Sequence, residues 1–220
     1  MTREEIRASI AEIGIIPALR VFSREDALFA AEAVFAHGIP IVEVTMTVPG
    51  ALEVISELAT RNPKLIVGAG SVAGADVARR CVGAGARFLT STGFNLEVVR
   101  YGVEKEVVVF PGALTPTEVM AAWDAGPDFV KIFPCTAMGG PAYIKALRGP
   151  FPYVPLIASG GINQQTAEDF ILAGAVALGI GSELIPHAAI ELRQEHRIGE
   201  LARRFLTIVK EARRPVYDRS

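Results

Sequence analysis

The sequence has few of the residues that build disulfide scaffolds and metal sites, since its 220 residues include only two cysteines and three histidines. Cys81 and Cys135 fit neither a disulfide framework nor a zinc-ligand spacing. Chains without disulfides are typical of a reducing cytosol, so we expect a cytoplasmic protein. His37, His187 and His196 fall in expected helices or near the C-terminus, away from the ends of the expected strands. We therefore expect no metal ion and no cofactor.

An excess of charge of one sign and a long apolar segment are also missing. The formal net charge of -2 gives no general attraction to nucleic acid. The longest uninterrupted apolar run, "FILAGAVALGIG" from Phe170 to Gly181, is shorter than the roughly 20 residues of a membrane span. The first residues, "MTREEIRASIAEIG", carry acidic groups where a signal peptide needs positive charge. We expect no nucleic-acid partner and no membrane partner.

Short apolar runs rich in valine and isoleucine recur along the chain, separated by segments with helical spacing. Apolar runs of this kind are typical of strands buried on both faces, and parallel strands need helical crossovers between them. Helix signals lie in the gaps, such as the capping residues Ser23 and Thr115, with Pro116 in the first turn. The runs are Ile15–Val21, Pro40–Thr45, Lys64–Gly70, Arg87–Gly93, Glu106–Gly112, Asp128–Pro134, Val154–Gly161 and Ala177–Ser182.

Eight β-α units in this length predict an α/β fold, namely a (β/α)8 TIM barrel. The segment before Ile15 is predicted to be an extra N-terminal helix. The run starts are roughly 20 to 26 residues apart, which leaves no room for a second domain, so we expect a single domain over residues 1–220. The alternative is a doubly wound open sheet. That fold requires a phosphate-binding glycine turn after the first strand, and "RVFSRED" has none.

One lysine lies in the middle of a hydrophobic run. Active sites of these barrels lie at the C-terminal ends of the strands, and of the five lysines only Lys131, in "DFVKIFP", is placed centrally in an expected strand. An amine is nucleophilic only when neutral, and burial favours the neutral form. The second and sixth strands lie opposite each other, so Glu43 can reach the same substrate and transfer protons. The alternative is a buried ion pair with no chemical role.

Glycine turns follow the seventh and eighth expected strands, in "SGGIN" and "GIGS". These two loops commonly form a phosphate site in such barrels, because exposed backbone N–H groups and helix N-termini meet an anion there. Either turn alone is an ordinary tight turn. Together they predict that a phosphate or another anion binds at Gly160, Gly161, Gly181 and Ser182.

A set of motifs, in this order and spacing, resembles the 2-keto-3-deoxy-6-phosphogluconate (KDPG) and 4-hydroxy-2-oxoglutarate (KHG) aldolases. The motifs are "VEVTMTVPGA", "VGAGSV", "FLTSTGF", "PGALTPTE", "KIFPCTAMGG", "GPFP" and "SGGI". The resemblance implies a class I aldolase, a homotrimer, that acts on a small 2-oxo acid. Its substrate would be a KDPG-type acid, cleaved to pyruvate and glyceraldehyde 3-phosphate, with KHG, cleaved to pyruvate and glyoxylate, as a second substrate.

The resemblance also implies roles for single residues. Lys131 would be the Schiff-base lysine and Glu43 the general acid/base. Ser71 stands where the family often has a threonine contacting the pyruvyl carboxylate, and Ser159 also replaces a common threonine. One departure concerns Thr47, which takes the place of an arginine that holds the substrate carboxylate in many members. We expect Arg20, at the end of the first strand, to supply that guanidinium from the neighbouring strand.

Two other functions fit parts of the pattern. The glycine turns suit a phosphosugar isomerase or epimerase, which has no use for Lys131 as a nucleophile. A catalytically idle barrel that serves as an oligomeric scaffold is the second alternative, and the intact pair of Lys131 and Glu43 argues against it.

Overall fold

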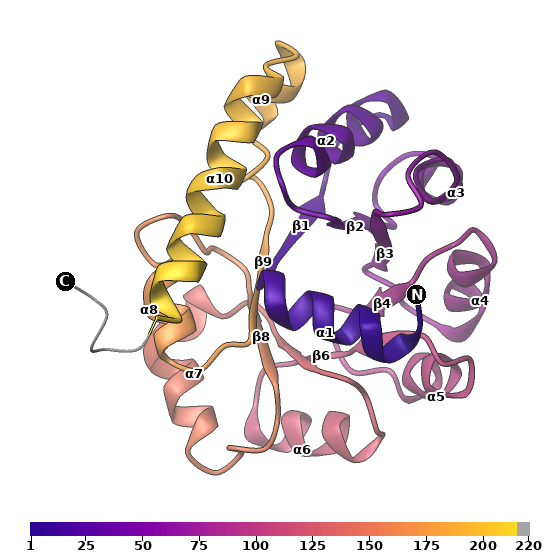
Figure 1. The fold of residues 1–220 in the computed structure, drawn as a ribbon. Coiled ribbons are helices and arrows are strands. Elements are labelled where there is room, and N and C mark those ends of the chain that lie inside the picture. Colours follow the sequence, from indigo (N-terminus) through magenta and orange to yellow (C-terminus); the bar gives the residue numbers. More distant parts are fainter. Residues whose placement is uncertain (215–220) are drawn as a thin grey trace.

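The computed structural model describes residues 1–214, so the last six residues of the expected 1–220 domain lie outside the described part. Parallel strands surround the centre of the molecule and helices surround the strands (Figure 1). The expected (β/α)8 barrel is confirmed. The strands are β1 Ile15–Leu19, β2 Ile41–Thr45, β3 Ile66–Gly70, β4 Phe88–Thr90, β5 Val108–Phe110, β6 Gly112–Ala113, β7 Val130–Ile132, β8 Leu156–Ser159 and β9 Ala177–Ile180.

The helices lie between the strands, as the spacing predicted. Ser23 caps α2 by accepting a hydrogen bond from the Asp26 N–H. Thr115 and Glu118 form a capping box at the start of α6, with Pro116 in its first turn. The α-helices are α1 Arg3–Ile13, α2 Arg24–Ala36, α3 Ala51–Arg61, α4 Ala75–Gly83, α5 Leu96–Glu104, α6 Pro116–Asp124, α7 Pro141–Arg148, α8 Ala167–Leu172, α9 His187–Glu191 and α10 Glu195–Ala212, and a 3-10 helix, η1, covers Thr136–Met138.

The fifth barrel strand is divided into two pieces, β5 and β6, at Pro111. Proline has no N–H to donate to a neighbouring strand, which interrupts the ladder. The hydrogen-bond ladder nevertheless continues across Pro111 through carbonyl acceptors. The Val109 carbonyl accepts from the Asp128 N–H at 3.0 Å, and the Pro111 carbonyl accepts from the Lys131 N–H at 2.9 Å. Since β5 also pairs with β4, these bonds close the ring of strands. The open doubly wound sheet is therefore wrong for this chain.

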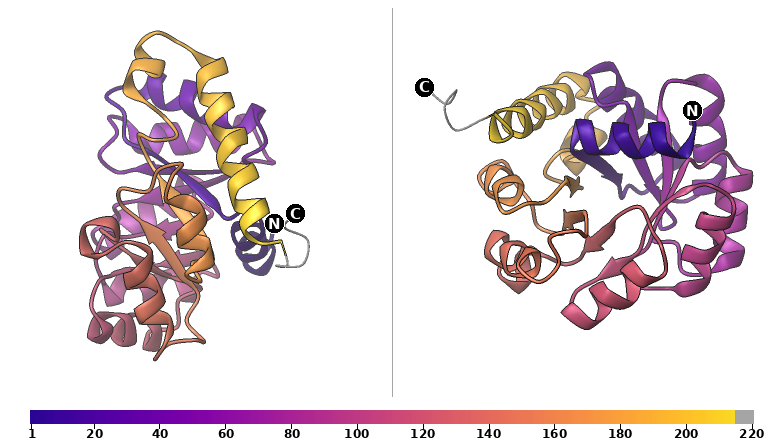
Figure 2. Two further views of the ribbon diagram at one scale, coloured as in Figure 1. Left: turned by 90° about the vertical axis from the view of Figure 1, so that its left-hand side faces the viewer. Right: turned by 60° about the horizontal axis from the view of Figure 1, so that its bottom comes forward.

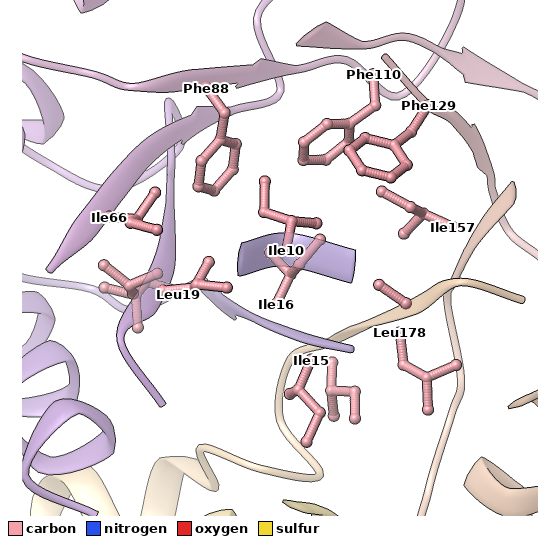
Figure 3. Close-up of a cluster of buried hydrophobic side chains, with 14 of the residues drawn as sticks. Ile10, Ile15, Ile16, Leu19, Ile66, Phe88, Phe110, Phe129, Ile157 and Leu178 are labelled. Atoms are coloured by element: carbon pink, nitrogen blue, oxygen red, sulfur yellow. The ribbon is translucent and has the colours of Figure 1, made fainter. Parts of the chain in front are cut away.

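The extra N-terminal helix is confirmed as α1, which lies across one end of the barrel (Figures 1 and 2). Its residues Ile6 and Ile10 are buried, and Ile10 points into the interior beside Phe88 and Phe110 (Figure 3). An ion pair also attaches α1 to the barrel, since the Arg3 Nε lies 3.0 Å from an oxygen of Asp128. Since α1 leads through a left-handed glycine turn directly into β1, it covers the N-terminal ends of the strands and leaves the opposite end free.

The barrel interior is filled with side chains. The rings of Phe88 and Phe110 stack with centroids 5.3 Å apart, and Phe129 meets Phe110 edge to face at 6.0 Å. Phe88 occupies the space that Gly68 leaves open, since a Cβ on Gly68 would come within 2.2 Å of its ring. This contact shows that Gly68 and its partner Phe88 both face inward. No helix among residues 1–214 has the length and apolar character needed to cross a membrane.

We expect Ile10→Ala to lower the free energy of unfolding by about 2–5 kcal/mol, because it leaves a cavity under the barrel that α1 cannot refill. Denaturant unfolding measures the loss. Ile13→Ala is the matched control, since Ile13 lies on the same helix but is only partly buried. Equal losses for the two variants would show that Ile10 does not seal the barrel.

Candidate active site

Lys131 and Glu43 meet inside the barrel near the C-terminal ends of β7 and β2. The Lys131 Nζ lies 3.6 Å from the Glu43 Oε2, and the two side chains are only 3% and 2% exposed. Glu43 on the second barrel strand and Lys131 on the sixth thus approach each other across the barrel, as the sequence predicted. The geometry suits proton transfer between Glu43 and a bound substrate, because a substrate atom at the amine is also within reach of the carboxylate.

Gly70 makes room for the Glu43 carboxylate. A Cβ on Gly70 would lie 2.0 Å from the Glu43 Oε1, a distance that no real side chain tolerates. The glycine in the "GAGS" motif is therefore required by the carboxylate on the neighbouring strand. A larger residue at this position would push Glu43 away from Lys131.

A cavity of about 260 Å³ opens beside this pair at the same end of the barrel. Its wall includes the ends of β1, β8 and β9 and brings together most of the predicted binding residues, namely Arg20, Ser159, Gly160, Gly161, Gly181 and Ser182. Lys131 and Glu43 do not line it. Phe133 connects the two regions, because it lines the cavity while its ring centroid lies 6.0 Å from the Lys131 Nζ and 5.8 Å from the Arg20 Cζ.

Ser159 and the glycines beside it are packed closely. The Ser159 hydroxyl donates a hydrogen bond to the Gly179 carbonyl at 3.3 Å. Gly160 and Gly161 have φ angles of 98° and 80°, which favour glycine over other residues. Two successive left-handed glycines turn the chain sharply after β8 along the cavity wall. The loop can therefore present N–H groups to an anion.

Ser71 and Thr47 lie outside this cavity. Ser71 directly follows β3 and has a positive φ of 58°. The Thr47 hydroxyl lies 2.7 Å from that of Thr45, which in turn donates to the Leu19 carbonyl at 2.7 Å. These bonds place Thr47 beside the end of β1, next to Arg20. Thr47, which the resemblance puts at the position of the family arginine, therefore lies near the strand end that Arg20 follows.

Two polar side chains at the cavity, and an aromatic ring stacked on one of them, were not selected from the sequence. His187 and Glu183 line the cavity, and Phe22 stacks on the His187 ring with centroids 5.1 Å apart. The expectation that His187 lies away from the strand ends is wrong, because the segment after β9 folds back over them. Its position a few residues after "GIGS" was a signal that could have been used. Among residues 1–214, no three histidine, cysteine or acidic side chains are grouped to hold a metal ion.

Both cysteines are free and buried. Burial raises the pKa of the Cys81 thiol and of the Cys135 thiol to about 11. A thiol is nucleophilic only as the thiolate, so neither cysteine is reactive at neutral pH. Neither thiol therefore competes with the Lys131 amine as a nucleophile.

The fold and the site together define a (β/α)8 barrel enzyme with a buried lysine and a carboxylate at the catalytic end. The profile of the KDPG and KHG aldolase family matches residues 6–201, and the chain belongs to this family of aldolases.

Similar proteins agree with this assignment. The chain is 34% identical to the 2-dehydro-3-deoxy-phosphogluconate aldolase of Pseudoalteromonas atlantica, over 86% of this chain and 88% of that protein. It is 33% identical to the KHG/KDPG aldolase of Escherichia coli strain K12, over 86% of this chain and 89% of that protein. The crystal structure of KDPG aldolase from Legionella pneumophila, with pyruvate captured at low pH as a covalent carbinolamine intermediate, has a TM-score of 0.83 and 35% identity. The match covers 89% of this chain and 95% of that one.

We expect the buried pair to reduce stability relative to an apolar core. Lys131→Met alone should lower the free energy of unfolding by about 3–5 kcal/mol at pH 8, because Glu43 is left as an uncompensated buried charge. The double variant Lys131→Met, Glu43→Leu should be at least as stable as the parent protein. Denaturant unfolding of both variants checks this, and a double variant less stable than the single one would contradict it.

Proposed function

We propose that this chain is a class I aldolase that cleaves a 2-keto-3-deoxy-6-phospho sugar acid of the KDPG type into pyruvate and glyceraldehyde 3-phosphate. The observation that carries the proposal is the 3.6 Å approach of the Lys131 amine to the Glu43 carboxylate, both buried at the catalytic end of the barrel. The Legionella relative supports it, because pyruvate is bound there as a covalent carbinolamine.

The chemistry follows from these two groups. The neutral Lys131 amine attacks the C2 carbonyl of the 2-oxo acid, and the resulting carbinolamine loses water to give an imine. Removal of the C4 hydroxyl proton breaks the C3–C4 bond, releases the aldehyde and moves the electron pair through C3 onto the imine nitrogen as an enamine. Protonation at C3 and addition of water then release pyruvate. Glu43 is the group placed to carry these protons, since it lies beside the amine.

The two anionic ends of the substrate require separate partners. We assign the carboxylate to Arg20, because a guanidinium offers a bidentate fork and Thr47 at the usual arginine position offers none. Ser71 and Ser159 are the proposed hydroxyl contacts, at the carboxylate and near the reacting carbon. Gly160, Gly161, Gly181 and Ser182 are the proposed phosphate contacts, and their common position on one cavity wall supports this assignment.

The proposal also covers a second substrate, the oligomeric state, the location and the extent of the domain. KHG, cleaved to pyruvate and glyoxylate, is a proposed second substrate, since the Escherichia coli relative is a KHG/KDPG aldolase. A homotrimer rests on the family resemblance alone. A cytoplasmic location is supported by the two free cysteines. The single closed barrel supports one domain over residues 1–220. A phosphosugar isomerase or an idle scaffold gives the Lys131 amine no task.

We expect incubation with pyruvate and borohydride to add one reduced adduct per chain, mapped by peptide mass to Lys131. Glu43→Gln should retain this adduct, yet its turnover should fall by about 10²- to 10⁴-fold, the range for loss of a general acid/base. Lys145→Arg is the control, since Lys145 is exposed on α7 and should not affect trapping. An adduct on another lysine, or no adduct in the parent protein, would refute the mechanism.

Arg20→Lys should weaken pyruvate binding without changing the preference for a phosphorylated substrate. Two charge-assisted hydrogen bonds from the glycine turns favour the phosphorylated acid by about 10²-fold or more in kcat/KM. If Arg20 binds the carboxylate, its substitution lowers kcat/KM for both substrates equally. Arg24→Lys is the control, because Arg24 pairs with Glu57 away from the cavity. A fall confined to the phosphorylated substrate would assign Arg20 to the phosphate instead.

A further inference from the structure

Two buried side-chain oxygens among residues 1–214 have no hydrogen-bond partner, the Glu43 Oε1 and the Thr90 Oγ1. Glu43 is 2% exposed and Thr90 is fully buried. Nearly all buried polar groups in folded proteins are paired, either with protein or with an ordered water. The proposed reaction uses the Oε2 of Glu43, which faces Lys131, and gives no role to Oε1 or to Thr90.

Strand register sets Thr90 beside Gly70, the residue over which the Glu43 Oε1 lies. In the ladder between β3 and β4, Gly68 pairs with Phe88 and Ala69 with Leu89, so Gly70 stands opposite Thr90. Gly68 and Phe88 face the barrel interior, and side chains alternate along a strand. Gly70 and Thr90, two residues further on, therefore also face inward.

Gly70 separates Glu43 from Thr90 without filling the space between them. The Glu43 Oε1 occupies the volume that a Gly70 side chain would take. The Thr90 side chain rises from the adjoining strand, one strand spacing of about 4.8 Å away. Across a separation of that size, one water molecule can make two hydrogen bonds of about 2.8 Å, one to each oxygen. The Thr90 hydroxyl can donate to or accept from such a water, and the Glu43 carboxylate can accept from it, so both buried oxygens gain a partner.

The backbone holds Thr90 in this place. Its carbonyl accepts from the Val72 N–H at 3.1 Å, while the next hydroxyl, on Ser91, donates to the Val72 carbonyl at 2.7 Å. The loop after β3 is thereby fastened to the end of β4. Thr90 has a fixed position from which to orient a group above Gly70.

We propose that Thr90 is a positioning residue for Glu43, whose Oε1 it holds through one buried water above Gly70. The bridge keeps Oε2 turned toward Lys131 during proton transfer. This inference rests on the proposed aldolase reaction. Loss of the hydroxyl frees the carboxylate to rotate, which slows the proton transfers but leaves the Lys131 amine in place to form the imine.

The test compares Thr90→Val, which keeps the shape but removes the hydroxyl, with Thr90→Ser, which restores it. Thr90→Val should lower kcat by about 10- to 10²-fold, the effect of losing one hydrogen bond to a charged group, with KM and pyruvate trapping unchanged. Thr90→Ser should recover most of kcat. In a Glu43→Gln background, Thr90→Val should have no further effect, because the group that it orients is gone.

Thr60→Val is the control, since it removes a threonine hydroxyl that is bonded within α3, away from Glu43 and the cavity, and should retain kcat. Thr90→Ala is a second hydroxyl deletion, used if the valine does not fold. An unchanged kcat in a folded hydroxyl-less variant, or an equal loss in the Glu43→Gln background, would overturn the proposal. Failure of the aldolase function itself is distinguishable, because the parent protein would then trap no pyruvate.

Discussion

The structure depends most on the placement of one amine and one carboxylate inside an apolar barrel. Each charge is expensive to remove from water, and together they are retained only because each is the other's partner. Several neighbouring features follow from this requirement. Gly70 has no side chain because Glu43 needs the space, and Phe133 covers the amine on the side of the cavity.

Closure of the barrel is what brings Glu43 and Lys131 within reach. The strands β2 and β7 are far apart in the order of the sheet and approach only because the ring is complete. Pro111 interrupts the fifth barrel strand, and backbone hydrogen bonds to the β7 segment continue across it. The Lys131 N–H takes part in these bonds. The residue that carries the proposed chemistry therefore also helps to join the two ends of the sheet.

Much of this arrangement could be predicted from the sequence, and the limits have physical causes. The eight apolar runs predict the barrel because burial on both faces leaves a clear pattern, and Lys131 is conspicuous because it breaks one. The division at Pro111 was not foreseen, since a proline next to a strand end has many outcomes. Thr90 gave no signal, because threonine is common in strands and only the register against Gly70 sets it beside Glu43. His187 was missed because its position depends on how a loop folds back.

The position of α1 has a consequence for the order of folding during synthesis. This helix precedes the strands in the sequence, but it contacts β5 and β9, and β9, Ala177–Ile180, is made more than 160 residues after α1. At about 5–20 residues per second, the apolar face of α1 waits roughly 8 to 33 s for its binding site. β1 waits equally long for its partner β9. The nascent chain thus exposes the apolar face of a helix and an unpaired strand edge until β9 has been made.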